Sequence, residues 1–369
     1  MSDSNWFQVR NDRDVPSPAL LIFVERVEEN IRRMLRLCPA ERLRPHMKTH
    51  KVPKLIQMQL AHGITRFKCA TIAEAEMVAA SGAPDVLLAY QPVGPNIERL
   101  IALAKKFPQA KFATILDNPA TLQALGKAAT GASCELEVLL DLDCGMHRCG
   151  IEPGETAAEL YRLLTTTTGL RPGGLHAYDG HLHQSNVAER AAACEIAFAQ
   201  VEKFRAQLES AGLPVPRIVA GGTPTFPMHA RRGHVECSPG TCVLWDHGYG
   251  TKLPDLDFLP AAVLLTRVIS QPAAHRICLD LGHKAVASEM PHPRAWFPQL
   301  PDAKPVMHSE EHLVLETNQA ANFAVGTVLY GIPWHICPTM ALHSQVEVVK
   351  NSRVTERWRV VARDRVLSV

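Results

Sequence analysis

Strand-like apolar runs and helix-like amphipathic segments alternate over the first two thirds of the chain. An early pair, the run Ala19–Val24 and the helical pattern Val27–Leu37, precedes them. The strand candidates that follow are Leu43–Lys48, Arg66–Ala70, Val86–Tyr90, Lys111–Ile115, Leu136–Leu142, Gly173–Tyr178, Arg217–Ala220 and His234–Cys237. The helix candidates between them are Pro53–His62, Ile72–Ser81, Ile97–Phe107, Pro119–Ala129, Glu155–Thr165 and Val187–Ala211.

Eight strands that alternate with helices over roughly 220 residues match the size of a (β/α)₈ barrel. The connection after the seventh strand is the weakest, because His229–Gly233 is too short for a full helix. A doubly wound open sheet is the competing architecture, and its cue would be a glycine-rich turn after an early strand. Neither of the first two strands has such a turn. We therefore predict an α/β protein in which residues 18–253 form a TIM-type barrel.

The pattern changes after Leu253. Short runs separated by turn residues follow, and none of them has a useful length of helical periodicity: Leu259–Ile269, Ile277–Leu281, His312–Leu315, Val325–Tyr330, Val346–Val349 and Trp358–Ala362. We predict that residues 254–369 form a second, mostly β domain. Residues 1–17 are expected to join it as a lead-in strand or arm.

Composition excludes several classes of partner. The 369 residues include 39 basic and 37 acidic ones, and the net charge of +2 gives no footprint for nucleic acid or an anionic membrane. The first ten residues lack a signal-peptide core, and no apolar run is long enough to span a bilayer. The ten cysteines have no disulfide-like spacing. We therefore expect a cytoplasmic protein with reduced thiols that acts on a small molecule.

Lys48 is the first candidate catalytic residue. It lies in the segment Arg42–Lys51, where Pro45 favours extended backbone and indicates a strand that ends in a loop. His46 and His50 flank Lys48, and crowded cations and burial both favour a neutral amine. A neutral lysine can form a Schiff base with a carbonyl cofactor. On its own, a basic run is more often a solvated face.

Further candidates follow later strands of the predicted barrel, at the end where barrel enzymes collect their active sites. The loop after strand five holds Arg148, and the loop after strand six holds Tyr178. Strands seven and eight are followed by glycine-rich loops that contain Gly221, Gly222, Thr223, Gly240 and Thr241. Glycines allow backbone N–H groups to approach an anion, and barrels often bind phosphate between these two loops.

A lysine at strand one and a phosphate site at strands seven and eight suit pyridoxal 5'-phosphate. The lysine takes the aldehyde carbon, while the phosphate is anchored across the barrel mouth. Arg148 is a candidate contact for the pyridine ring face or its phenolic oxygen. Tyr178 is a further candidate cofactor contact from the neighbouring loop.

Four motifs resemble the D-serine dehydratase and D-threonine aldolase family of alanine-racemase-type, fold type III pyridoxal phosphate enzymes, which includes D-threo-3-hydroxyaspartate dehydratase. They are Arg44-Pro-His-Met-Lys-Thr-His50, Gly221-Gly-Thr-Pro-Thr225, Pro239-Gly-Thr241 and Pro333-Trp-His-Ile-Cys-Pro-Thr339. The resemblance spans essentially the whole chain. It implies that Lys48 is the cofactor lysine and that the protein is a homodimer with active sites near the subunit interface. One departure is Cys242, at a position where the family is expected to have an aromatic residue.

His335 and Cys337 are the candidate metal ligands. Pro333 and Pro338 favour extended backbone, in which residues i and i+2 point to the same side. An imidazole and a thiolate suit zinc, and two protein ligands leave positions for water or substrate. An ordinary His and Cys in a β turn would be the simpler interpretation, but the family resemblance implies a divalent metal here, with zinc first and manganese or magnesium as alternatives.

His181 and His183 are a rival metal pair, of the kind found in metal-dependent amidohydrolases. Such a pair is expected after the first barrel strand, whereas this one follows strand six. The function that the family resemblance implies is a dehydratase, an ammonia-lyase that converts D-serine, D-threonine or D-threo-3-hydroxyaspartate to a keto acid and ammonia. An aldolase is the alternative, and Cys337 favours the dehydratase because the aldolases tend to have aspartate there. A racemase and a non-catalytic pyridoxal phosphate carrier are less favoured.

Overall fold

The computed structural model describes residues 5–369, which form two compact units. The barrel unit contains Met34–Lys48, Pro53–Gly240 and Asp364–Val369. The β unit contains the described residues up to Arg33, Thr49–Val52 and Thr241–Arg363. Within residues 5–369, no helix has the length and apolar character needed to cross a membrane. The domain limits expected from the sequence stay predictions.

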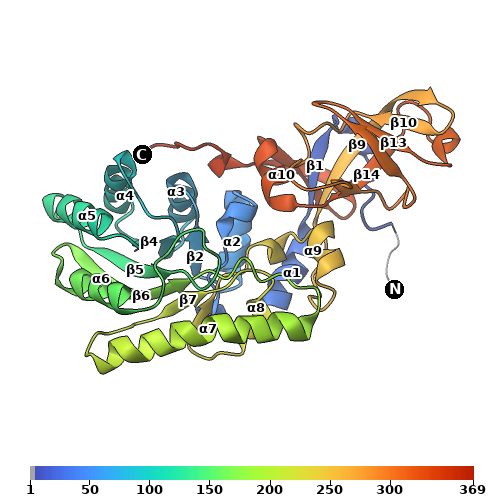
Figure 1. Ribbon diagram of the computed structural model, residues 1–369. Coiled ribbons are helices and arrows are strands. Elements are labelled where there is room, and N and C mark those ends of the chain that lie inside the picture. The colour runs from blue at the N-terminus through green and yellow to red at the C-terminus, as the bar shows by residue number, and fades with distance from the viewer. Residues whose placement is uncertain (1–4) are drawn as a thin grey trace. The chain divides into compact units, whose positions relative to one another are not determined.

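The barrel unit is built on a parallel sheet of seven strands in the order β2-β3-β4-β5-β6-β7-β8. The strands are β2 (Arg66–Cys69), β3 (Asp85–Leu88), β4 (Lys111–Leu116), β5 (Leu136–Leu142), β6 (Leu170–Ala177), β7 (Ile218–Ala220) and β8 (Val235–Cys237). The helices are α2 (Pro53–Ala61), α3 (Ile72–Ala80), α4 (Pro95–Lys106), α5 (Pro119–Gly131), α6 (Glu155–Thr166), α7 (Val187–Ser210) and α8 (Phe226–Ala230). Figure 1 shows α5, α6 and α7 along the outside of this sheet. The predicted α/β barrel-type fold class is confirmed.

Local sequence explains where these elements begin. The strands are almost continuously buried, which is typical of parallel sheets covered on both faces. Thr71 caps α3 by accepting a hydrogen bond from the Glu74 backbone N–H, and Glu74 accepts one from the Ala70 N–H. Asn118 caps α5 and Asn186 caps α7 in the same way.

The segment predicted as the first strand, Leu43–Lys48, differs from a regular strand. Leu43 forms an isolated bridge to Cys237 of β8, and His46 forms one to Lys68 of β2. Pro45 lacks an N–H and interrupts the ladder, although its carbonyl accepts a hydrogen bond from the Lys68 N–H. The segment therefore still closes the sheet between β8 and β2, but through a few backbone contacts rather than a full ladder.

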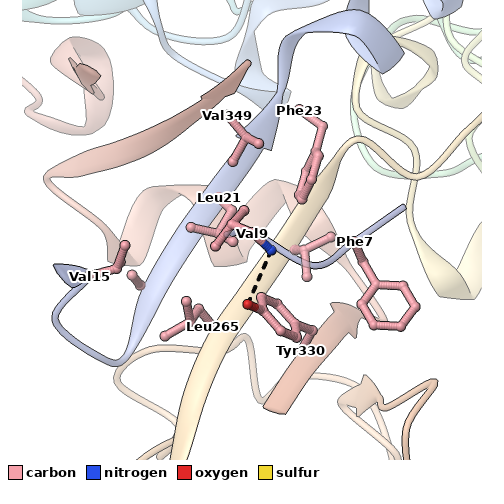
Figure 2. Close-up of a cluster of buried hydrophobic side chains, with 10 residues drawn as sticks. Phe7, Val9, Val15, Leu21, Phe23, Leu265, Tyr330 and Val349 are labelled. Carbon is pink, nitrogen blue, oxygen red and sulfur yellow. Dashed lines mark hydrogen bonds between the residues drawn. The ribbon is translucent and has the colours of Figure 1, made fainter. Parts of the chain in front are cut away.

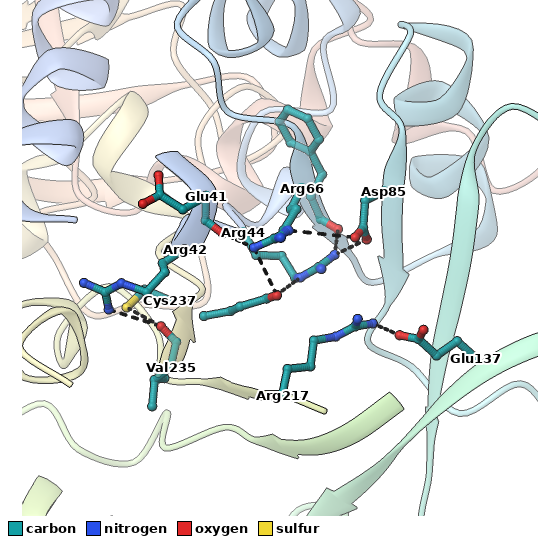
Figure 3. Close-up of polar contacts among 11 residues, drawn as sticks. Glu41, Arg42, Arg44, Arg66, Asp85, Glu137, Arg217, Val235 and Cys237 are labelled. Carbon is teal, nitrogen blue, oxygen red and sulfur yellow. Dashed lines mark hydrogen bonds and ion pairs between the residues drawn. The ribbon is translucent and has the colours of Figure 1, made fainter. Parts of the chain in front are cut away.

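Paired charges lie together near the beginnings of the barrel strands (Figure 3). Arg44, which is fully buried, donates hydrogen bonds of 2.6 Å to Glu236 and to Asp85. Arg66 lies 3.3 Å from Glu236, and Arg217 pairs with Glu137. A buried charge that loses its partner costs about 3–5 kcal/mol, so these residues are better explained as structure than as catalysts.

The β unit is built on a sheet of nine strands. Its main path is β12-β13-β10-β9-β1-β15-β16, and β14 pairs with β9 and with β11. The strands are β1 (Ala19–Phe23), β9 (Ala262–Ala273), β10 (Arg276–Leu279), β11 (Ala295–Trp296), β12 (Lys304–His308), β13 (Leu313–Glu316), β14 (Val328–Pro333), β15 (Gln345–Lys350) and β16 (Arg353–Arg359). Its helices include α9 (His247–Lys252) and α10 (Ile336–Leu342), and α1 (Val24–Leu37) follows β1.

An apolar cluster holds the amino-terminal arm against this sheet (Figure 2). Phe7, Val9 and Val15 are buried against side chains of β1, β9, β14 and β15. The Val9 N–H donates a 3.2 Å hydrogen bond to the Tyr330 hydroxyl. Each fully buried side chain of this size stabilises the fold by about 1.5–3 kcal/mol. The expected lead-in segment is therefore an arm without a regular strand over residues 5–17, and its residues 1–4 lie outside the described part of the chain.

Candidate active site

Lys48 lines a cavity of about 580 Å³ at the carboxyl ends of the barrel strands. It lies in a short 3₁₀ helix, Met47–Thr49, directly after the segment that bridges β8 and β2. Arg148 and Tyr178 line the same cavity. Its other lining residues are His46, Lys68, Ala70, Ala89, Tyr90, Gln91, Val93, Ile115, Asp117, Asp141, Cys149 and His176. Three residues that the sequence placed after different strands are therefore brought together.

Arg148 lies over the aromatic ring of Tyr178. Its guanidinium carbon is 5.0 Å from the ring centroid, which is within the range of a cation–π contact. Backbone hydrogen bonds shape the loop that holds Arg148, because Asp143 accepts from the Gly145 and His147 N–H groups at 2.9 and 3.0 Å. The Asp143 carboxylate thus braces the turn that precedes Arg148.

Sequence reasoning missed three polar residues in this cavity. Lys68 in β2 is buried, and its ammonium lies 5.5 Å from the Tyr178 ring centroid. Burial lowers the pKa of Lys68 to about 7, and the charge of Lys48 adds to this shift. His176 Nδ1 lies 2.6 Å from an oxygen of Asp141, and His176 Nε2 is buried with no hydrogen-bond partner within the described chain. The sequence did contain a signal for these residues, because a charged or polar residue in the middle of an otherwise apolar strand is unusual.

The two glycine-rich loops lie against each other. The Gly240 N–H donates a 3.1 Å hydrogen bond to the Thr223 hydroxyl oxygen. Gly221 has a φ of +76°, and a Cβ there would lie 2.5 Å from the His229 ring. A Cβ on Gly222 would lie 3.1 Å from the Tyr178 ring, so the loop backbone packs closely against this cavity-lining side chain. Thr241 follows Gly240 and begins a 3₁₀ turn in the β unit, where its hydroxyl lies 3.7 Å from Cys337 Sγ.

Substitutions in these loops should weaken the binding of a phosphorylated cofactor. For Thr223→Ala we expect a loss of about tenfold or more, the equivalent of one hydrogen bond to a charged group. Gly222→Val should lose more, because its side chain would collide with Tyr178 and block the approach of the phosphate. Affinity is measured by titrating cofactor-free protein with pyridoxal phosphate.

The control is Gly233→Ala, since a Cβ at Gly233 meets nothing within 4 Å. Wild-type affinity in both loop variants would mean that Gly221–Thr225 and Ser238–Thr241 are only turns.

His335 and Cys337 lie at the start of α10 in the β unit. His335 is the N-cap residue in extended conformation, whereas Cys337 is in the first helical turn. The expected extended geometry for both residues was wrong, because proline is tolerated in a first helical turn and Pro338 lies there. The two side chains nevertheless interact, because Cys337 is one of the groups that raise the pKa of His335. Cys337 Sγ also lies 3.3 Å from the Thr49 hydroxyl.

One carboxylate contacts the His335 ring, and a second anchors the backbone beside it. His335 Nδ1 contacts Glu289, which leaves Nε2 as the nitrogen available to a metal. Burial lowers the pKa of His335, but hydrogen bonds to Cys337 and Glu289 outweigh that effect and raise it to about 9. Buried Asp246 accepts a 3.0 Å hydrogen bond from the Ile336 N–H and anchors the start of the helix. An imidazole and a thiolate fit a zinc-type site, and a carboxylate on the second imidazole nitrogen fixes the orientation of the ring.

Among the described residues, one group of three metal-type ligands lies close together, and it is separate from His335 and Cys337. It consists of Asp179, Cys194 and His229, all buried in the barrel unit. His181 and His183, the rival pair, are not part of any such group among these residues. The ring of His181 instead lies 3.2 Å from the position of a Cβ on Gly145.

Comparison with known proteins identifies the family of the chain. Residues 22–246 match the alanine racemase N-terminal domain, and residues 261–349 match a putative serine dehydratase domain. The chain belongs to the alanine racemase N-terminal domain family. In this family it is 30% identical over 356 residues to a D-threonine aldolase from Arthrobacter sp., a match that covers 95% of this chain and 93% of the relative.

A second relative and a solved structure are also similar to this chain over nearly its whole length. The chain is 26% identical over 371 residues to D-threo-3-hydroxyaspartate dehydratase from Delftia sp. HT23, covering 93% of this chain and 96% of that protein. The solved structure of D-threonine aldolase from Filomicrobium marinum has a TM-score of 0.88 at 27% identity, covering 97% of this chain and 98% of the other. This fold type III pyridoxal phosphate family has both dehydratase and aldolase members, which confirms the resemblance drawn from the motifs.

Proposed function

We propose that this protein is a pyridoxal phosphate- and divalent-metal-dependent dehydratase that converts a β-hydroxy D-amino acid to a keto acid and ammonia. The main support for this proposal is that Lys48, Arg148 and Tyr178 line one cavity. The Tyr178 ring also packs against Gly222 of the glycine-rich loop. Membership of a pyridoxal phosphate family with dehydratase and aldolase members supports the reaction class.

The residues present fit the cofactor. At Gly221 and Gly222 a side chain would meet His229 or Tyr178, so the loop backbone comes close to its surroundings only because both residues are glycines. Thr223 and Gly240 hold the two loops together, and Thr241 follows directly. The unpartnered His176 Nε2 gives the cavity a buried polar atom that a ligand could satisfy. These features are those of a cavity that binds an anionic, partly aromatic ligand.

Each residue has a distinct role in the proposed reaction. When bound, pyridoxal phosphate supplies an electron sink for Cα, and a divalent ion supplies a Lewis acid for the β-hydroxyl. Lys48 would hold the cofactor and, as a free amine, would take the proton from the substrate Cα as general base. Arg148 and Tyr178 orient the cofactor ring, and Gly221, Gly222, Thr223, Gly240 and Thr241 bind its phosphate. His335 and Cys337 hold the metal, with Glu289 fixing the histidine ring.

Zinc is the metal that this ligand pair favours. Thiolate is a soft ligand, and imidazole suits zinc, copper, iron and nickel, whereas manganese and magnesium prefer oxygen donors. In this family a D-threo-3-hydroxyaspartate dehydratase has been solved in a form described as metal-free. Manganese and magnesium remain alternatives until the bound ion is measured.

An aldolase is the second candidate, favoured by the identity to the D-threonine aldolase of Arthrobacter sp.. The same residues would serve, but the β-hydroxyl would lose a proton and the Cα–Cβ bond would break, giving glycine and an aldehyde. Cys337, where the aldolases tend to have aspartate, is the reason for placing the dehydratase first. A racemase is less favoured because racemisation needs no metal beside the β-carbon. A non-catalytic pyridoxal phosphate carrier is less favoured because it needs no β unit.

Product analysis tests the proposal directly. Purified protein with pyridoxal phosphate and zinc is incubated separately with D-serine, D-threonine and D-threo-3-hydroxyaspartate, and ammonia and aldehyde are measured in parallel. We expect ammonia and keto acid in equal amounts from at least one substrate. Aldehyde without ammonia would make the protein an aldolase, and neither product from any substrate would contradict both candidates. The cytoplasmic location and the homodimer stay predictions.

A further inference from the structure

A buried polar network lies behind the first glycine-rich loop of the barrel unit. Asp179 follows β6, His229 lies in α8, and Thr225 ends the loop that begins at Gly221. The three side chains are 5%, 1% and 0% exposed. None of them lines the cavity that holds Lys48. Their position suggests an action on the loop rather than on a substrate.

Both oxygens of Asp179 are engaged by this network. One accepts a 2.9 Å hydrogen bond from the Thr225 hydroxyl, and the other lies 2.8 Å from His229 Nε2. The Thr225 oxygen is in turn 3.4 Å from the Gly222 N–H. A continuous path of polar contacts therefore joins a buried carboxylate to the loop backbone.

The His229 ring also supports the loop by direct packing. A Cβ on Gly221 would lie 2.5 Å from His229 Cδ2, so backbone and imidazole are in close contact. Burial lowers the pKa of His229, but hydrogen bonds to Asp179 and Cys194 outweigh that effect and raise it to about 9. At neutral pH the ring is therefore a cation paired with Asp179, immediately behind a loop that we expect to hold a phosphate.

A bound metal is the competing explanation, because Cys194 completes a set of three metal-type ligands with Asp179 and His229. Cys194 Sγ lies 3.6 Å from His229 Nε2 and 4.0 Å from Asp179. A zinc ion would take the same His229 nitrogen and the Asp179 oxygen that now contact each other at 2.8 Å. A metal ion and the Asp179–His229 hydrogen bond are therefore alternative uses of the same atoms, and the Cys194→Ala variant below distinguishes them.

We propose that Asp179, Thr225 and His229 form a positioning network that holds the Gly221–Thr225 loop in the conformation that binds a phosphomonoester. This inference rests on the proposed function, because the phosphate in question is that of pyridoxal phosphate. The network makes the protein select the phosphorylated cofactor over its unphosphorylated form. It acts through the loop backbone and touches no reacting atom.

The test compares two ligands that differ only in the phosphate. Cofactor-free protein is titrated with pyridoxal phosphate and with pyridoxal, and the affinity ratio is compared among variants. Thr225→Val and His229→Gln should each lose roughly tenfold in affinity for pyridoxal phosphate and leave that for pyridoxal unchanged. Thr225→Ser keeps the hydroxyl and should restore the wild-type ratio. Gly233→Ala is the control and should match wild type with both ligands, whereas Cys194→Ala, which keeps the Asp179–His229 contact, tests the metal alternative.

Several results would overturn the inference. An equal loss for both ligands would indicate general unfolding, and an unchanged ratio in both Thr225→Val and His229→Gln would remove any role for the network. Should His229→Gln fail to fold, the Thr225→Val and Thr225→Ser pair decides alone. Loss of a stoichiometric metal and of cofactor affinity in Cys194→Ala would support the metal instead. Wild-type protein that binds neither ligand would refute the proposed function itself, a result separate from those of the variants.

Discussion

Lys48→Ala should abolish both the visible absorbance of the bound cofactor and the turnover of substrate. The reason is that one amine performs two tasks in the proposed reaction, the covalent link and the removal of the α-proton. Loss of a general base alone costs about 10²–10⁴-fold in rate, so both tasks together should cost at least the upper end of that range. The measurement is the absorption spectrum and ammonia release of the variant beside wild type.

A second lysine in the cavity means that the test must identify which lysine binds the cofactor. Lys68 lines the same cavity, and its pKa is lowered to about 7 by burial and by Lys48, so it is also a potential nucleophile. Borohydride reduction followed by peptide mapping should label Lys48. Lys54→Ala, a change at an exposed position of α2, is the control and should keep the spectrum. A label on Lys68 would contradict the assignment of the cavity.

Removal of the metal should stop elimination while the cofactor stays bound. Hydroxide is a poor leaving group, and a Lewis acid beside it is worth several kcal/mol of transition-state stabilisation. Cys337→Ala should therefore lose ammonia release and keep slow exchange of the substrate α-proton with solvent. Cys337→Asp offers an oxygen ligand and should bind manganese or magnesium better than wild type does. A higher ratio of aldehyde to keto acid in this variant would connect Cys337 to the reaction outcome.

The metal experiment uses protein stripped with a chelator, verified by elemental analysis, and then given zinc or manganese. Activity should return with metal, and cofactor absorbance should persist throughout. Cys134→Ala, at another half-buried cysteine, is the control and should respond as wild type does. Full ammonia release by verified metal-free protein would return His335 and Cys337 to ordinary packing residues.

Much of the fold could be predicted because parallel strands leave a strong signal. Strands such as β5 and β6 are largely buried runs, and their ends locate the loops of Arg148 and Tyr178, respectively. The segment around Pro45 was harder, since its contacts to β8 and β2 depend on partners far away in the sequence. The start of α10 was misread because Pro333 and Pro338 suit both extended backbone and a first helical turn.

The polar residues of the barrel unit were less predictable for a different reason. Lys68 and His176 lie within buried strands, where composition alone does not show which face a side chain occupies. Asp179 and His229 are 50 residues apart, and their contact follows from the packing of α8 against the end of β6. Local periodicity cannot supply such contacts, because they arise only when distant elements meet.

The pairing of β1 has a consequence for the order in which the protein can be made. Leu21 and Ile22 lie between β9 on one side and β15 on the other, whose residues are synthesised more than 200 positions later. During translation the β1 segment leaves the ribosome before both of its partner strands and cannot pair until they have been made, whereas β2 to β8 pair with sequence neighbours. A cut between β8 and β9 would thus leave an apolar strand without its sheet, so neither half could be produced separately as an intact folding unit.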